Sequence, residues 1–261
     1  MNNRISIPNI NYIKQICQDL KACDSISKAK ILTEAIVSAY PLLNFDIRTD
    51  QEFRFLRSRK CGKIGFSKLN EILSPPHNLV QAGRLNSANN PILYASKNAW
   101  ATYDEIGAEK GDFVQSAILK IKASSLKVCT IGEYKNAQRW GSSSYPNLTA
   151  ELSKFAINLA QSNQDAFKSI IYLDSFLSSV LTDRNAKKNG YLATQHLAEA
   201  IFKKHPDIDG IFYKGVESGE ALNIAIQEEK SSNLIEVDDL FVCEIIDNHG
   251  HGIFDTKIIK K

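Results

Sequence analysis

The end of the chain contains four short segments: GIFYKGV (residues 210–216), LNIAIQ (222–227), FVCEIID (241–247) and GIFDTKII (252–259). They are rich in β-branched and aromatic residues and are separated by polar turns, a pattern typical of β-strands. This part of the chain is therefore predicted to form several neighbouring strands.

A second group of strands is predicted from Glu52 onward. Phe53 and Phe55 recur there at every second position, and the apolar runs PILYA (91–95) and AILKI (117–121) follow. A mainly β segment is therefore expected to begin here.

Residues between these runs predict a loop and a short helix. The segment 74–90 (SPPHNLVQAGRLNSANN) is rich in Pro, Gly, Ser and Asn, which favour turns. Residues 98–109 then predict a helix, with Asn98 as its N-cap and Gly111 just beyond its end.

Helical periodicity dominates two other regions. Up to about Phe45, apolar residues recur at three- and four-residue spacing; Asp24 is a candidate N-cap of a second helix, and Pro41 would end it. Three more helices are predicted in the middle of the chain, the last from Tyr191 to His205. The order of helices, strands, helices and strands indicates an α+β fold.

The composition excludes several classes of protein. The 32 basic and 29 acidic residues give a net charge of +3, too small for the basic field of a dedicated nucleic-acid binder. The five cysteines are scattered and form no close CxxC pair, which favours a reducing compartment. No signal peptide or apolar span is evident, so a soluble cytoplasmic protein without membrane contact is expected.

Two arginines, in a predicted strand and in a glycine-led loop, are candidates for a phosphate-binding site. Arg57 in FLRSR (55–59) and Arg84 in GRLN (83–86) carry guanidinium groups that can bind a diphosphate through two parallel hydrogen bonds. Taken singly, each arginine is more simply explained as an ordinary surface residue.

Together, these motifs resemble the RES family, which is named for arginine, glutamate and serine positions. The resemblance runs from about Phe53 to Asn248 and depends on the order of short motifs. These are FLRSR, Pro75 and Pro76, GRLN, LYA (93–95) with an acidic residue on the next helix, Tyr191 and Gln195 in YLATQ, DGIFY (209–213), and Asn223 ten residues beyond Tyr213.

The resemblance implies an ADP-ribosyltransferase-like mixed β core with a helical middle segment. A RES domain over residues 49–261 would follow a helical N-terminal extension over residues 1–48. The implied function is that of a toxin that degrades NAD, its substrate, by cleaving the nicotinamide–ribose bond, as a glycohydrolase or a phosphorylase. An antitoxin protein is the implied partner. A protein ADP-ribosyltransferase and an inactive NAD-binding or interaction module stay open as alternatives.

The resemblance also implies roles for individual residues. Glu105 matches the family's glutamate and would stabilise positive charge on the ribose in the transition state, with Glu109 as the second choice. Arg84 matches the arginine of the GR motif and would hold phosphate, with Gly83 allowing close backbone approach. Tyr94 would stack on nicotinamide, although a packed core tyrosine is an equal alternative.

The remaining implied NAD contacts include one departure from the family pattern. In the family's YPSV strand the serine follows the tyrosine by two positions, and here Gly215 stands in that place, with Ser218 three residues further on. The other expected contacts are Arg57, Asn86, Gln195, Tyr213 and Asn223. No metal is expected, because His249 and His251 alone make a poor ligand set.

Overall fold

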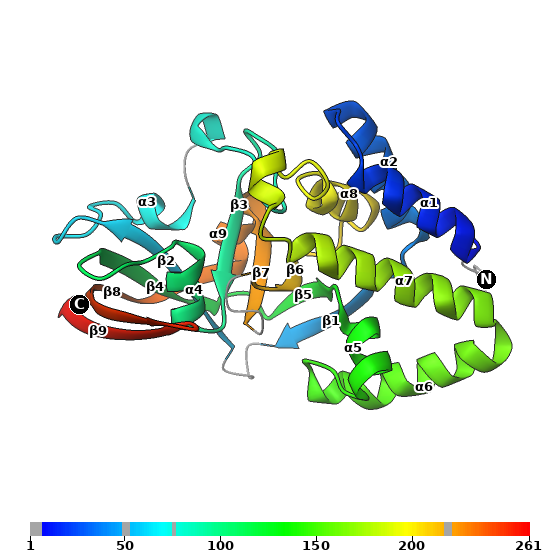
Figure 1. Ribbon diagram of the computed structural model, residues 1–261. Coiled ribbons are helices and arrows are strands. Elements are labelled where there is room, and N and C mark those ends of the chain that lie inside the picture. Colours follow the sequence, from blue (N-terminus) through cyan, green and yellow to red (C-terminus); the bar gives the residue numbers. More distant parts are fainter. Residues whose placement is uncertain (1–6, 49–52, 75–76, 217–220) are drawn as a thin grey trace. The chain divides into compact units, whose positions relative to one another are not determined.

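The computed structural model describes residues 7–48, 53–74, 77–216 and 221–261 of the chain (Figure 1). The chain divides into two compact units. The first comprises Met1–Leu43, Gly83–Asn86 and Cys129–Pro206, and the second comprises Asn44–Ala82, Ser87–Val128 and Asp207–Lys261.

The first unit is built from helices. They are α1 (Ile10–Lys21), α2 (Ile26–Ala39), α5 (Glu133–Trp140), α6 (Pro146–Ser162), α7 (Gln164–Leu181), the 3-10 helix η3 (Ala186–Asn189) and α8 (Leu197–Lys204). Helix α1 packs against α2 and α7, α2 packs against α8, and α5 and α6 pack against α7.

Apolar faces and caps explain these helices. The side chains at the three- and four-residue spacing predicted for α1 are all buried: Ile13, Ile16, Cys17 and Leu20. Each fully buried aliphatic side chain contributes about 1.5–3 kcal/mol relative to its exposed state. The side chains of Asn9 and Asn163 accept hydrogen bonds from the first turns of α1 and α7 and so define where these helices begin.

A buried carboxylate ties three parts of the first unit together. Asp174 on α7 accepts hydrogen bonds from the backbone N–H groups of Gly132 (2.8 Å) and Lys135 (2.7 Å) at the start of α5, and from the hydroxyl of Tyr40 after α2. The side chain is 0% exposed, and burial raises its pKa although these hydrogen bonds act in the opposite direction. Gly132 has a φ of 100°, a conformation that favours glycine and lets the chain turn into α5.

The second unit contains most of a nine-stranded sheet in the order β1-β5-β6-β7-β3-β2-β4-β8-β9 (Figure 1). Its strands are β1 (Leu43–Arg48), β2 (Arg54–Cys61), β3 (Ile92–Ser96), β4 (Phe113–Ile121), β5 (Ser125–Thr130), β6 (Gly210–Lys214), β7 (Leu222–Gln227), β8 (Ile235–Gly250) and β9 (Ile253–Lys260). The short helices between them are α3 (Leu69–Leu73), the 3-10 helix η2 (His77–Leu79), α4 (Ala99–Glu105) and α9 (Glu228–Leu234). Along the part of the sheet with the order β6-β7-β3-β2-β4-β8-β9, each strand is antiparallel to the next one.

Aromatic packing gives this unit part of its core. The ring of Phe212 on β6 stacks with Phe45 at a centroid distance of 6.2 Å and packs at tilted angles against Phe53 and Phe55. Such pairs add about 0.5–1.5 kcal/mol beyond the burial of their area. The phenylalanine alternation that predicted β2 therefore supplies core contacts.

The α+β class predicted from the sequence is confirmed, as are the strands at the end of the chain and those in PILYA and AILKI. The segment 74–90 is mainly a loop in its described part, apart from η2. Helices α5 and α9 and strand β5 were not predicted individually. In the described residues, no helix combines the length and hydropathy that a bilayer crossing requires.

Two expectations about the N-terminal region were wrong, whereas the end of its second helix was predicted correctly. Helix α2 ends at Ala39, just before Pro41, as predicted, but residues 43–48 of the predicted helical extension form strand β1. Alternation explains this strand, because Ile47 is buried while its polar neighbours are exposed. The N-cap of α2 is Ser25, and not Asp24.

The helix expected over residues 98–109 is shorter, and so is the one expected from Tyr191. The first, α4, begins after Asn98 as predicted and ends at Glu105, because Gly107 adopts a positive φ of 59°. Glu105 is therefore the last residue of a seven-residue helix and does not lie within a longer one. Residues 191–196 form turns, with Tyr191 at a φ of 57°, and α8 begins only at Leu197.

Candidate functional site

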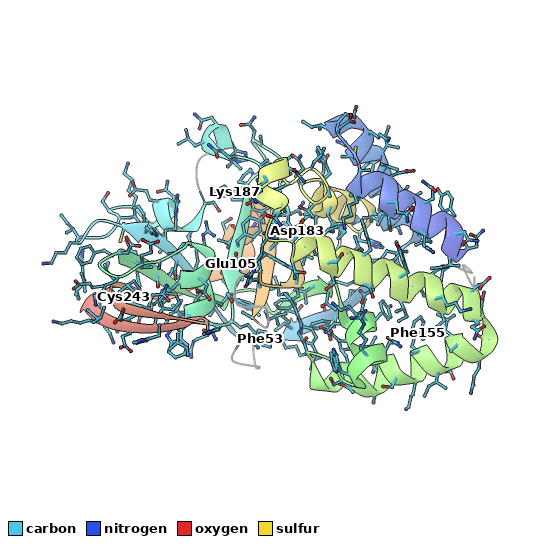
Figure 2. All side chains as sticks on the ribbon, viewed as in Figure 1. Phe53, Glu105, Phe155, Asp183, Lys187 and Cys243 are labelled. Carbon is cyan, nitrogen blue, oxygen red and sulfur yellow. The ribbon has the colours of Figure 1, made fainter. Side chains whose placement is uncertain are left out.

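The carboxylate of Glu105 is held in place by two donors from distant parts of the second unit. Its Oε1 atom accepts a hydrogen bond from the Nδ2 atom of Asn223 at 3.2 Å and from the backbone N–H of Val216 at 3.1 Å. Asn98 caps the start of α4, and Glu105 lies exposed at its end (Figure 2). A fixed carboxylate with access to solvent can face a positively charged reacting group.

Strand register places other predicted residues beside this carboxylate. Asn223 on β7 lies opposite Tyr213 on β6 and opposite Ser96 on β3, so the three side chains share one face of the sheet. Tyr94 lies two residues before Ser96 and projects from the same face. Tyr94, Tyr213 and Asn223 thus lie on one face of the sheet, and Glu105 contacts this face through Asn223. Their joint role in a site stays a prediction.

Asn223 retains an unused acceptor at this face. A carboxylate without a proton only accepts hydrogen bonds, so the nitrogen of the Asn223 amide must face Glu105, and this contact fixes the orientation of the amide. The Oδ1 atom is buried and has no hydrogen-bond partner within the described part of the chain. A buried acceptor of this kind is suited to a donor group on a ligand.

Arg57 makes structural contacts between β2 and its neighbours. Its Nε atom donates to the carbonyl oxygen of Ile72 in α3 at 3.0 Å, and its Nη1 atom donates to that of Tyr94 in β3 at 2.9 Å. Burial lowers the pKa of Arg57 to about 10, with a further lowering from Arg59. The guanidinium therefore stays charged at neutral pH, and part of its donor set is engaged by carbonyl groups.

Gly215, where the resemblance to the RES family leads us to expect a serine, lies directly after β6. Its backbone N–H donates to the carbonyl of Ala221 at 2.8 Å, and the next residue, Val216, provides the N–H that binds Glu105. Ser218 lies outside the described residues.

Arg84 belongs to the first unit, where it caps a helix. Its Nη1 atom donates to the carbonyls of Leu181 (2.8 Å) and Asp183 (3.1 Å) at the end of α7, and its guanidinium lies 5.7 Å from the ring centroid of Tyr191. A cation at a helix C-terminus is favourable because carbonyl groups there lack helical partners.

The loop around Arg84 contains the other predicted residues of this unit. The backbone N–H of Gly83 donates to the carbonyl of Asn86 at 2.8 Å, which closes a tight turn around Arg84. The Nε2 atom of Gln195 lies 3.4 Å from the carbonyl of Gly190, in the turn that contains Tyr191. The convergence of Arg84 with Tyr94 and Glu105 stays a prediction, since these residues belong to different units.

The second choice for the catalytic carboxylate lies elsewhere. Glu109 is exposed in the turn after α4, where its backbone N–H donates to Asp112.

His249 pairs with Asp255 at 3.0 Å beside the β8–β9 turn, and this contact raises the pKa of His249. Across the described ranges, no group of three or more His, Cys, Asp or Glu side chains is arranged to hold a metal.

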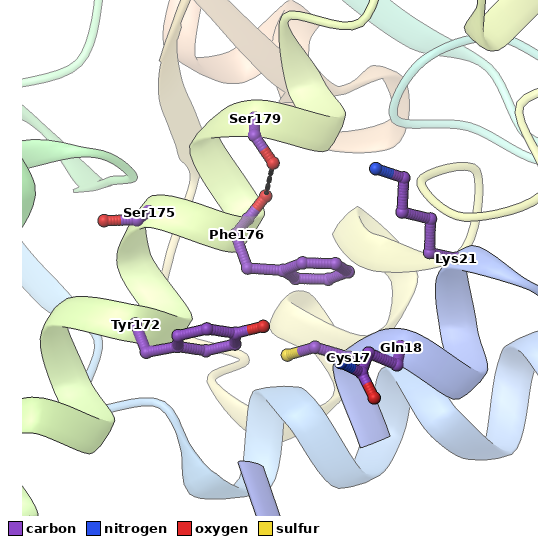
Figure 3. A pocket seen from close by; sticks show the side chains of 7 residues that line it. All are labelled: Cys17, Gln18, Lys21, Tyr172, Ser175, Phe176 and Ser179. Carbon is purple, nitrogen blue, oxygen red and sulfur yellow. Dashed lines mark hydrogen bonds between the residues drawn. The ribbon is translucent and has the colours of Figure 1, made fainter. Parts of the chain in front are cut away.

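A separate groove lies within the first unit, between α1 and α7 (Figure 3). It has a volume of about 350 Å³ and is lined by Cys17, Gln18, Lys21, Tyr172, Ser175, Phe176 and Ser179. Burial raises the pKa of the Cys17 thiol to about 12, so this cysteine is not a reactive thiolate. None of the residues predicted for NAD binding lines this groove.

Sequence reasoning missed one contact at the Glu105 site. The backbone N–H of Val216 carries no side-chain signal, so no motif could have identified it as a partner of Glu105. The amide of Asn223 was identified by its spacing from Tyr213, but its contact with Glu105 required the register of three strands.

Comparisons with known proteins give weak structural similarity and no match in sequence. No family model and no curated protein matches the sequence. A chain from the solved M. tuberculosis MbcT–MbcA toxin–antitoxin complex aligns with a TM-score of 0.36 and 10% sequence identity, covering 83% of this chain and 92% of that chain. A TM-score this low transfers no residue role to the present chain.

Proposed function

We propose that this chain is an enzyme that degrades NAD by cleaving the bond between nicotinamide and ribose. The observation that carries the proposal is the Glu105 carboxylate, exposed yet held by Asn223 and Val216 beside a face that presents two tyrosines. The ordered motifs that resemble the RES family support the same conclusion from the sequence.

The chemistry explains why a fixed carboxylate matters. As the C1′–N bond breaks, its electron pair leaves with nicotinamide, and the ribose acquires oxocarbenium-like positive charge. A carboxylate near that carbon interacts more strongly with the transition state than with the ground state and so lowers the barrier. Water or phosphate then forms the new bond to C1′ and releases a proton to solvent.

The neighbouring side chains suit the nicotinamide end of the substrate. Tyr94 is half-buried and would offer ring surface to a flat base, whereas Tyr213 is 6% exposed and would support that face from within. The Oδ1 atom of Asn223, which lacks a partner in the described structure, would accept a hydrogen bond from the substrate. Gly215, where the family resemblance leads us to expect a serine, would leave room for a water molecule in place of a hydroxyl.

The resemblance to the RES family assigns the phosphate groups of NAD to arginines. It implies Arg84 and Arg57 as diphosphate ligands, with Gly83, Asn86, Gln195 and Ser218 as further contacts. Arg84 already donates to two carbonyls through Nη1, so phosphate binding would use its other N–H groups. As a toxin, the chain would be neutralised by an antitoxin protein, and no metal would take part.

The test is mass spectrometry of the products formed from NAD by the purified full chain. We expect nicotinamide with ADP-ribose in water, or with a phosphorylated ADP-ribose if phosphate is the acceptor. Glu105→Gln should lower the rate about 10²–10³-fold, the loss typical when one group that stabilises the transition state is removed. Glu109→Gln is the matched control, because this carboxylate lies four residues away and is exposed.

Each outcome distinguishes between hypotheses. ADP-ribose attached to an added protein would assign the chain as an ADP-ribosyltransferase. NAD binding by calorimetry without any product would favour the inactive module. A larger loss for Glu109→Gln than for Glu105→Gln would overturn the assignment of the carboxylate.

A further inference from the structure

Three buried hydroxyl groups connect α4 to the sheet of the second unit. The Oγ of Ser58 on β2 lies 2.6 Å from the Oγ1 of Thr102 on α4 and 2.8 Å from the Oγ of Ser116 on β4. Thr102 also donates to the carbonyl of Ala99 at 2.6 Å. All three residues are buried: Ser58 is 4% exposed, Thr102 is 7% exposed and Ser116 is 0% exposed.

The direction of these hydrogen bonds follows from counting protons. Each hydroxyl has one hydrogen to donate. Because Thr102 uses its hydrogen on the Ala99 carbonyl, Ser58 must donate to Thr102, and Ser116 must in turn donate to Ser58. The chain therefore has a single order, from Ser116 through Ser58 and Thr102 to the backbone of α4.

Helix α4 depends on such contacts for its orientation. It has only seven residues, and a helix this short is not stable on its own in water. The neighbouring Tyr103 is buried against Phe254 with their ring centroids 5.7 Å apart, and its hydroxyl meets the Cys243 thiol at 3.6 Å. Thr102 and Glu105 are three residues apart and so are neighbours on the helix surface.

We propose that Thr102 is a positioning residue for Glu105. The ordered hydroxyl chain fixes the rotation of α4 about its axis, and this rotation brings the Glu105 carboxylate to Asn223 and Val216. The inference rests on the proposed NAD cleavage, because it assigns Thr102 a role in that reaction without contact to the substrate.

The test compares two substitutions at one position. Thr102→Val replaces the hydroxyl by a methyl group of similar size, whereas Thr102→Ser keeps the hydroxyl and removes the methyl group. We expect kcat to fall about 10- to 100-fold in Thr102→Val with little change in KM, since small misplacement of a reacting group lowers the rate of the chemical step. Thr102→Ser should restore most of kcat; equal losses in both variants would overturn the proposal.

A double-mutant cycle separates positioning from general destabilisation. If Thr102 acts through Glu105, Thr102→Val should have almost no further effect on the residual rate of Glu105→Gln. A full multiplicative loss in the double variant would show that Thr102 acts independently of Glu105 and would overturn the proposal.

A measurement without turnover keeps this test distinct from that of the proposed function. The side-chain NH₂ resonances of Asn223, assigned by NMR in the full chain, report its contact with Glu105. They should shift in Thr102→Val and return toward the wild-type positions in Thr102→Ser, even if the wild-type chain does not cleave NAD. Unchanged resonances in Thr102→Val would overturn the positioning role, whatever the enzymatic result.

Discussion

Asp174 in the first unit and Glu105 in the second are both carboxylates held by backbone and side-chain donors, but Asp174 is buried and Glu105 is exposed. Asp174 is fully buried between α5, α7 and Tyr40, and its two oxygens accept three hydrogen bonds. Glu105 is exposed, and its contacts with Asn223 and Val216 both use Oε1. The same type of anchoring therefore serves to hold helices together in one unit and to present a charged oxygen in the other.

The largest effect on stability should come from removing the buried member of this pair. Asp174→Ala leaves three donors unpaired in the interior and should lower the free energy of unfolding by about 3 kcal/mol. Glu105→Ala, with an exposed carboxylate, should lower it by about 1 kcal/mol or less. Urea denaturation of both variants measures these losses. Equal losses would show that the buried and the exposed carboxylate contribute the same amount to the free energy of unfolding.

A smaller effect is expected from removing one donor of the buried cluster. Tyr40→Phe deletes the hydroxyl that donates to Asp174 and keeps the packing of the ring against Tyr134, whose centroid is 6.2 Å away. We expect a loss of about 1.5 kcal/mol, since the acceptor keeps two backbone donors. A loss as large as that of Asp174→Ala would show that Tyr40 is the main partner of the carboxylate.

The smallest effect is a pH dependence that distinguishes Asp174 from an ordinary surface carboxylate. Burial raises the pKa of Asp174 above its usual 3.8, so between these two pKa values the folded state binds more protons than the unfolded state. Its contribution to stability is present below about pH 3.8 and is lost as the pH rises through the raised pKa.

Asp174→Asn does not titrate and serves as the reference for this measurement. The stability of the wild type relative to this variant should decrease with rising pH, by at most about 1.4 kcal/mol per pH unit. Denaturation curves at a series of pH values provide the test. A relative stability that increases with pH would mean that hydrogen bonding outweighs burial at Asp174.

The sequence singled out the residues around Glu105, whereas it gave no sign of the Asp174 cluster. Short motifs named Tyr94, Glu105, Tyr213 and Asn223; antiparallel pairing of three strands places Tyr94, Tyr213 and Asn223 on one face, and a hydrogen bond joins Glu105 to Asn223. Asp174 has no comparable signal, because its partners are two backbone N–H groups and a tyrosine 134 residues away.

The errors at helix ends have a similar cause, because they depend on backbone conformation and not on a side-chain pattern. Helix α4 ends early because of a left-handed glycine, and residues 43–48 form a strand after Pro41; both outcomes depend on local conformation that periodicity does not report. The carbonyl contacts of Arg57 likewise could not be predicted, because they depend on neighbours distant in sequence, and its role at a diphosphate stays a prediction.

Those contacts of Arg57 have a mechanical consequence for the sheet. Strand β2 pairs with β4 over eight residues, whereas within the described part of the chain its pairing with β3 has a single residue pair, Leu56 with Ser96. At this junction, the guanidinium of Arg57 on β2 donates a hydrogen bond to the backbone carbonyl of Tyr94 on β3. This side-chain contact takes the place of a backbone hydrogen bond between the two strands. Under load or partial unfolding, the sheet should separate first along this line, into a β2–β4–β8–β9 ribbon and a ribbon that retains β3, β7 and β6.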